Sequence, residues 1–341
     1  MQKGISQLFN LKVCLISILS FIFILLIDLS DTFSQNSLIN KTIVIDPGHG
    51  GTASFDSYRV GPTGEREEWI NLRVAKELKD LLKEKGSNVI LTRQIDVQVE
   101  LQERAKVAKE NKADLFLSIH HNATADPDVN FPIVYYHGYA SANEASVVLG
   151  KEIILELKKK LYNNDGPVSL VSDHTIFPGS GAKVLRETYN IPGVLIEASL
   201  FTNPEEEQRL KKKSYNLLEA KAIASAIENY FSDVEYPVHK MDDIKKIDDF
   251  SVFQEAERMN EQALLWKDNF TKGVKLFEKG GKTNFLEAYE LFTLSVKSFP
   301  DSPVARQCHL YRAEILNELG KYSQANMENL RVKEFYIDIK N

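Results

Sequence analysis

Two histidines and two glutamates stand where an α/β sheet would bring them together. His49, His120 and Glu197 each lie within or just after a short apolar stretch, and a helical segment begins at Glu67. In open α/β sheets, ligands bind outside the carboxyl ends of the strands. Two imidazoles and one carboxylate form the ligand set of a catalytic zinc, and a further carboxylate can act as general base toward water. The four residues therefore predict a hydrolytic metal site at one sheet edge.

The elements that must position these residues alternate between strands and helices. Strands are predicted over 41–46, 88–92, 114–119, 132–137 and 194–199, and helices over 67–85, 99–111 and 142–161. After the last strand we predict an acidic turn that begins at Pro204 and then a helix through Tyr230. Helices of this length between buried strands are typical of an α/β fold. We expect a mostly parallel, twisted sheet flanked by helices on both faces.

The pattern changes after Phe231. Residues 232–250 lack periodicity and predict a linker, and from 251 to 336 only helical stretches are predicted, without a strand. Two pieces resemble tetratricopeptide helices, since Ala288 and Ala325 within them are separated by about one 34-residue repeat. We expect a small all-α, tetratricopeptide-like domain that could bind a partner protein; a generic pair of helical hairpins is the alternative.

The chain begins with a segment typical of an export signal. Lys3 and Lys12 precede an apolar run over 13–27, which has the length of a signal-peptide core and is short for a membrane span. We predict a signal peptide over 1–34 and a periplasmic protein. The alternative is an uncleaved anchor in the inner membrane with the rest of the chain facing the periplasm.

Composition and cysteine count exclude several classes of protein. Hydrophobic residues make up 43% and charged residues 26% of the 341 residues, as in ordinary globular proteins. The net charge of −6 makes nucleic acid a poor partner, because nucleic-acid binding requires a dense basic surface. Removal of the signal would leave Cys308 as the only thiol, which excludes a disulfide framework and a zinc site made of thiolates.

Four sequence blocks, in order, resemble the zinc-dependent N-acetylmuramoyl-L-alanine amidases (amidase family 3). The blocks are IVIDPGHGG at 43–51, REEWINL at 66–72, SIHHNA at 118–123 and VLIEASLFTN at 194–203. The resemblance covers residues 41–231. It implies that His49, Glu67 and His120 bind one zinc ion and that Glu197 is the catalytic glutamate. It also implies peptidoglycan as the substrate, cleaved between N-acetylmuramic acid and L-alanine.

Three glutamates lie near the second ligand position: Glu65, Glu67 and Glu68. The glutamate of the family stands four residues before the Asn of an Asn-Leu pair. Asn71 and Leu72 form that pair here, so the resemblance favours Glu67.

Further residues are predicted around the site. Neighbouring residues of a strand point to opposite sides, so His120 fits the ligand position better than His121, which we expect to line the cleft. We predict substrate contacts for His121, Asn122, His174 and Arg186, and a supporting role for Asp46.

Three of these predictions have alternatives. His174 lies in the segment 168–179, predicted as a substrate-contacting loop; this loop could instead pack on the surface, or His174 could touch the metal site. Arg186 could bind a carboxylate of the substrate or form a structural ion pair. Asp46 could accept a hydrogen bond from a ligand ring or brace the turn after the first strand.

Two other functions are compatible with parts of the pattern. A zinc peptidase acting within the stem peptide would use the same metal chemistry. A non-catalytic wall-binding scaffold would lack a ligand or the base, and neither is missing here.

Overall fold

The computed structural model describes residues 38–51, 59–232, 236–240, 246–254 and 256–339. The predicted signal segment 1–34 lies outside these residues. In the described part of the chain, no helix combines the length and the apolar character that a membrane crossing requires.

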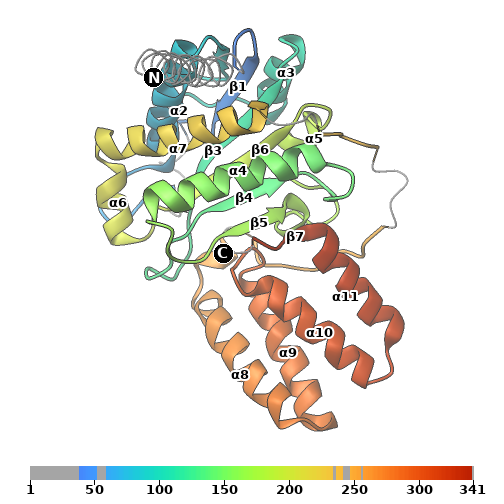
Figure 1. Cartoon of the computed structure of the whole chain (residues 1–341). Helices are drawn as coiled ribbons and strands as arrows, with labels where there is room; N and C mark the ends of the chain where they lie inside the picture. Colours follow the sequence, from blue (N-terminus) through green and yellow to red (C-terminus); the bar gives the residue numbers. More distant parts are fainter. Residues whose placement is uncertain (1–37, 52–58, 233–235, 241–245, 255, 340–341) are drawn as a thin grey trace, which may run out of the picture.

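A seven-stranded mixed sheet forms the centre of the molecule (Figure 1). Its strands are β1 Thr42–Pro47, β2 Asn88–Leu91, β3 Leu115–Asn122, β4 Ile133–Tyr136, β5 Ser169–Ser172, β6 Gly193–Leu200 and β7 Tyr336–Ile337, in the order β2-β1-β3-β6-β4-β5-β7. Strands β2, β1, β3 and β6 are parallel, as are β4 and β5, whereas the β6–β4 and β5–β7 pairs are antiparallel. The predicted mostly parallel sheet is therefore confirmed, with a reversal of direction at β4.

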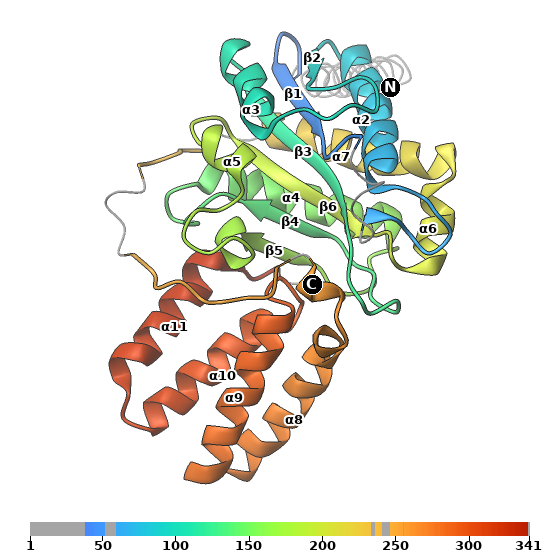
Figure 2. The same cartoon turned by 180° about the vertical axis from the view of Figure 1, so that it is seen from behind.

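Helices cover both faces of this sheet. On one face lie α2 Glu67–Glu84, α4 Glu144–Leu161 and α7 Lys213–Ser232, whose apolar side chains share one buried core with the strands. In helix α2 the apolar residues Ile70, Val74 and Leu78 recur every four residues and are all fully buried. This spacing places them on one side of the helix, which therefore packs on the sheet. The opposite face carries α3 Leu101–Glu110 and α5 Lys183–Glu187, and the strands come to the front there in Figure 2. The acidic stretch predicted as a turn from Pro204 forms the short helix α6 Pro204–Leu210, and the helix predicted after it is α7.

The C-terminal region is helical, as predicted, and extends from the β5–β7 edge of the sheet (Figure 1). Two short 3₁₀ turns, Glu257–Met259 and Glu261–Leu265, precede α8 Trp266–Lys279, α9 Lys282–Ser298, α10 Ala305–Glu318 and α11 Tyr322–Phe335. Phe299 and Phe335 belong to the same buried core as Phe116 and Tyr135 of the sheet. The helices therefore pack directly on the α/β part. Their likeness to tetratricopeptide repeats stays a prediction.

Two short strands contradict the prediction of local structure. Residues Ser169–Ser172 lie in the segment predicted as a loop, but they form β5, a buried strand that pairs with β4. Strand β7 follows α11, where only helices were predicted, and aligns Ile337 with Leu170 of β5. Both strands are too short for their own pattern to reveal them, because pairing across the sheet decides their conformation.

Candidate metal centre and its cleft

The turn after β1 presents His49 with an unusual backbone. Its φ angle is 56°, in the left-handed region that non-glycine residues rarely adopt. Two buried arginines hold this turn: Arg93 donates from Nη2 to the carbonyl of Gly48 at 2.8 Å, and Arg104 donates from Nη2 to the carbonyl of His49. Neither arginine was predicted to take part in the site.

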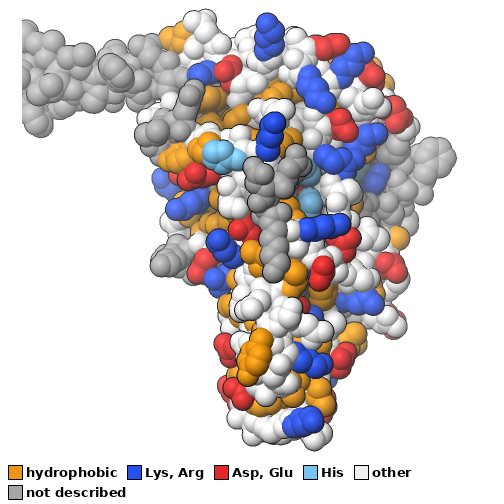
Figure 3. Space-filling view, turned by 90° about the vertical axis from the view of Figure 1, so that its right-hand side faces the viewer, with side chains coloured by type: hydrophobic (Ala, Val, Ile, Leu, Met, Phe, Trp, Pro, Cys, Tyr) orange, Lys and Arg blue, Asp and Glu red, His pale blue; other side chains and the backbone are white. Residues whose placement is uncertain are grey.

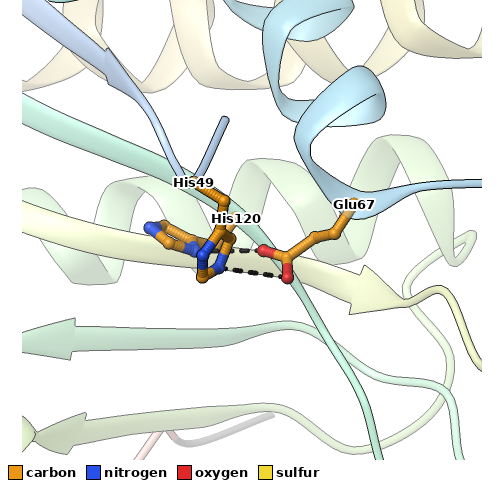
Figure 4. Close-up of side chains that lie close together, drawn as sticks. All are labelled: His49, Glu67 and His120. Atoms are coloured by element: carbon orange, nitrogen blue, oxygen red, sulfur yellow. Dashed lines mark hydrogen bonds and ion pairs between the residues drawn. The ribbon is translucent and has the colours of Figure 1, made fainter. Parts of the chain in front are cut away.

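The carboxylate of Glu67 faces both histidine rings, which lie side by side (Figure 4). Its Oε2 is 3.1 Å from Nε2 of His49, and its Oε1 is 3.0 Å from Nδ1 of His120. Asn71, one turn further along α2, donates from Nδ2 to Oε1 of Glu67 at 3.1 Å. The loop after β1, the first turn of α2 and the end of β3 therefore place the three side chains together.

The protonation states suit a divalent cation. Burial lowers the pKa of His120, which favours the neutral ring that can donate a lone pair. Burial alone would raise the pKa of Glu67, but the adjacent His49 and His120 rings hold it well below its usual value. One ligand atom from each residue lies within 4.8 Å of the others. Two imidazoles and one carboxylate at this spacing fit a zinc ion that keeps a position open for water.

Asp46 braces the turn rather than a ligand ring. Its Oδ1 accepts from Nη1 of Arg104 at 2.8 Å and from the Thr92 hydroxyl at 2.5 Å, and its Oδ2 accepts from the Ser118 hydroxyl at 2.9 Å. The same Arg104 holds the carbonyl of His49. Asp46 therefore has the bracing role, one of the two roles predicted for it, and holds the turn after the first strand through Arg104.

Glu197 lies on the strand next to His120. Strands β3 and β6 are paired with His120 directly opposite Glu197. Both residues line a cleft of about 570 Å³, together with His49 and Glu67. Lys183 and Arg186 also line it. Figure 3 shows Lys and Arg side chains near histidines on one face of the molecule. The cleft therefore combines a metal-ligand group, a separate carboxylate and basic side chains.

A family model described as N-acetylmuramoyl-L-alanine amidase matches residues 43–229, more than half of the chain. The chain belongs to this amidase family. It is 32% identical to the probable cell wall amidase LytH of Staphylococcus epidermidis over 202 aligned residues. This alignment covers 59% of this chain and 62% of LytH. It is 29% identical to the N-acetylmuramoyl-L-alanine amidase AmiA of Escherichia coli K12 over 225 aligned residues. This alignment covers 56% of this chain and 76% of AmiA. The chain thus matches less than two thirds of the staphylococcal protein's length.

Solved structures are also similar to this chain. The N-acetylmuramoyl-L-alanine amidase AmiC2 of Nostoc punctiforme gives a TM-score of 0.48 at 30% identity, covering 57% of this chain and 98% of that one. The CwlD amidase of Clostridioides difficile, solved in complex with the GerS lipoprotein, gives a TM-score of 0.49 at 28% identity. The alignment covers 57% of this chain and 99% of that one.

The other two glutamates near α2 of the amidase domain lie elsewhere. Glu65 accepts a hydrogen bond from Arg73 at 2.7 Å. Glu68 is fully buried, with Arg66 3.9 Å away. Of the three candidates, Glu67 is the one whose carboxylate meets both histidines.

His121 lines the cleft, as predicted, but both of its ring nitrogens lie against protein partners. Its Nδ1 lies 2.8 Å from Oδ1 of Asn71 and its Nε2 lies 3.1 Å from Oε2 of Glu219, and the side chain is fully buried. The ring therefore braces α2 against α7, and its contact with substrate stays a prediction. Asn122 also lines the cleft, and its Nδ2 is buried without a hydrogen-bond partner among the described residues.

His174 lies outside the cleft of the amidase domain. Its ring packs against His137, Tyr139 and Phe335, and it does not appear among the described residues that line the cleft. The structure therefore does not bring His174 to this cleft, because the short β5 carries this part of the segment into the packed edge of the sheet. Its contacts with substrate or metal stay predictions. Phe177, from the same segment, does line the cleft.

Arg186 lines the cleft and also braces the loop in front of α5. Its Nη1 donates to the carbonyls of Ser180 at 2.8 Å and Gly181 at 3.3 Å. A structural role is thus visible, although the partners are carbonyls rather than the predicted ion pair.

The sequence reasoning missed cleft residues that lie outside the matched amidase region. Phe253, Gln254 and Arg258 line the same cleft as Glu197. They precede the C-terminal helices, in a stretch where no motif or periodicity marks them as functional.

Proposed function

We propose that this protein hydrolyses the amide bond between N-acetylmuramic acid and L-alanine in peptidoglycan. We further propose that His49, Glu67 and His120 hold one zinc ion and that Glu197 is the general base. The observation that carries the proposal is the meeting of two imidazoles and one carboxylate beside Glu197, in a chain of the amidase family.

The amide is difficult to hydrolyse because resonance stabilises its carbonyl and the amine is a poor leaving group. A bound zinc ion would polarise the carbonyl and make water more acidic. Glu197 takes a proton from the attacking water, whose oxygen forms the new bond to the lactyl carbon. The carboxyl group of Glu197 then gives the proton to the alanine nitrogen as the C–N bond breaks.

The supporting residues keep the ligands in place before substrate arrives. Asn71 donates to the Glu67 carboxylate, and Arg104 fixes the His49 backbone while paired with Asp46. Fixed partners of this kind reduce the reorganisation that a metal site needs. Because peptidoglycan lies outside the cytoplasm, the proposal also includes export to the periplasm, by a cleaved signal or an N-terminal anchor.

Mass spectrometry of purified peptidoglycan after digestion tests this function. We expect release of intact stem peptides that begin at L-alanine, with loss of release when a chelator is added. Glu197→Gln should keep one zinc per chain but lose at least about a hundredfold in rate, whereas His49→Ala should lose the metal in elemental analysis. Shortened peptides would instead indicate a peptidase, and an undiminished rate in the Glu197 variant would contradict the assigned base.

A further inference from the structure

The stretch in front of the C-terminal helices is held firmly by them. The Phe250 ring lies 5.1 Å from the Arg312 guanidinium and 5.6 Å from that of Arg331, measured to the ring centroid. The His309 ring meets the same phenyl ring edge-on at 5.2 Å. The Phe253 amide donates to the carbonyl of Lys297 on α9 at 2.8 Å. The helical region thus binds its own preceding segment.

This arrangement places Arg258 in the wall of the cleft. The residue is 7% exposed, and its Nη2 donates to Oδ1 of Asp301 at 2.8 Å. The guanidinium lies 5.0 Å from the centroid of the Phe299 ring. Asp301 also accepts from the hydroxyl of Tyr135 on β4, and the Arg258 carbonyl accepts from the Ala125 amide at 3.3 Å. Contacts to both regions of the chain therefore fix the position of Arg258.

The guanidinium has more donors than the protein uses. An arginine offers five N–H donors in a rigid fork, and Nε of Arg258 is buried without a hydrogen-bond partner in the part of the chain that the structure describes. Burial alone would lower the pKa of Arg258, but the Asp301 carboxylate raises it, so the group stays charged. A buried donor beside a cleft requires water or a ligand. A carboxylate matches the fork geometry best among the groups of a peptide.

We propose that Arg258 forms a subsite that binds a carboxylate on the peptide part of the substrate. The inference rests on the proposed amidase function, because the lactyl group of the uncleaved substrate is an amide and the peptide is then the part that carries free carboxylates.

The proposal gives the C-terminal helices a role within the amidase itself. Arg258 lies beyond residue 229, where the family match ends, yet it shares the cleft with Glu197. The helices hold the segment that carries Arg258, and Asp301 after α9 orients its guanidinium. They thus complete one wall of the substrate cleft.

Two soluble muramoyl peptides test the subsite: one with free peptide carboxylates and one with the same groups amidated. The quantity to measure is kcat/KM for the free-carboxylate substrate divided by kcat/KM for the amidated one, in the full protein and in Arg258→Gln. We expect the unmodified protein to prefer the free carboxylate by about tenfold to a hundredfold, the factor that hydrogen bonds to a charged group supply. The ratio should fall to about one in Arg258→Gln, whatever the absolute rates are. Arg258→Lys keeps the charge but loses the fork and should lie between them.

The control variants separate recognition from folding. Arg306→Gln removes a half-exposed arginine that lies 3.7 Å from Asp338, and it should leave the ratio unchanged. If the loss of Arg258 destabilises the protein by leaving Asp301 unpaired, the double variant Arg258→Gln/Asp301→Asn removes that charge and should still show a ratio of about one. Zinc content and thermal midpoint are measured for each variant.

Calorimetric binding of the two free peptides provides a readout without catalysis. We expect the unmodified protein to bind the peptide with free carboxylates more tightly than the amidated peptide. This difference in affinity should be lost in Arg258→Gln. An unchanged preference in that variant, or no preference in the unmodified protein, would overturn the subsite. If the zinc-loaded protein cleaves neither substrate, the amidase proposal fails, while the binding comparison still decides whether Arg258 recognises the carboxylate.

Discussion

At the scale of single residues, the backbone of Gly48 determines where the His120 imidazole can lie. A Cβ atom at position 48 would come within 2.3 Å of Cε1 and Nε2 of this ring. Contacts that short do not occur between real side chains, so the ring would have to leave its place beside Glu67. The absence of a side chain at position 48 thus leaves room for the His120 ring in the proposed metal centre.

Gly48→Ala should therefore release the metal. We expect zinc content to fall at least about tenfold, because the change disturbs one of three ligands, and hydrolysis to fall with it. Elemental analysis of the purified variant measures this. Gly64→Ala is the matched control, since no atom lies within 4 Å of its added Cβ and its φ of 91° adds only backbone strain. Equal zinc content in the two variants would contradict the packing argument.

The thiol of Cys308 should be inert in the folded protein. The side chain is fully buried in α10, and burial raises its pKa to about 12. Because the thiolate is the reactive form, almost none is present at neutral pH. Iodoacetamide should leave Cys308 unmodified under native conditions and label it after unfolding, as followed by peptide mapping. Rapid native labelling at this position would show that α10 opens more readily than its packing indicates.

At the scale of elements, strand β3 divides two tasks between neighbouring residues. His120 faces Glu67 and the cleft, whereas His121 packs between α2 and α7 against Asn71 and Glu219. The alternation of side chains along a strand enforces this division. The end of β3 therefore contributes to the proposed metal centre on one side and anchors the helix that carries Glu67 on the other.

The segment around Phe250 depends on its contacts with α10 and α11. Phe250→Ala removes the ring that lies against Arg312, Arg331 and His309. We expect hydrogen exchange of the Phe253 amide to become about tenfold faster, since such contacts stabilise by about 1–2 kcal/mol. The zinc content should stay unchanged, because the metal ligands lie on other elements.

Hydrogen–deuterium exchange with mass spectrometry measures this change. Leu286→Ala, on a 46% exposed side chain of α9, is the control and should leave the exchange of Phe253 as it is. Identical exchange in both variants would mean that the segment is held by other contacts.

At the scale of the whole molecule, the α/β part and the C-terminal helices share one buried core. Phe116 and Tyr135 of the sheet belong to the same cluster as Phe292, Phe299 and Phe335. Strand β7 adds backbone hydrogen bonds between the end of the chain and β5. The region predicted as a separate domain is therefore joined to the sheet by side chains and by backbone.

We expect the metal-free protein to unfold in a single thermal transition. Two parts that share a core lose it together, so the calorimetric and van't Hoff enthalpies should agree. Differential scanning calorimetry measures both. Two separated transitions, as the sequence-predicted linker over 232–250 would suggest, would show that the shared core contributes little to cooperativity.

The sequence by itself determined the strand that precedes His49, the helix that begins at Glu67 and the strands that carry His120 and Glu197. Each of these residues lies in a short motif whose apolar neighbours mark the element, so local pattern and family resemblance were sufficient. The choice among three adjacent glutamates also followed from a local spacing, that of Glu67 and Asn71, and the structure brings Glu67 to both histidines.

Only the tertiary structure decided the rest of the site. Strands β5 and β7 form because they pair within the sheet, β5 with β4 and β7 with β5. His174 lies away from the cleft because β5 joins the sheet. Arg258 lies in the wall of the cleft, where Asp301 holds its guanidinium. In each case the deciding contact joins residues far apart in the chain. A local sequence pattern records which residues are apolar and how they are spaced, but not which distant partner will complete a strand or a charge pair.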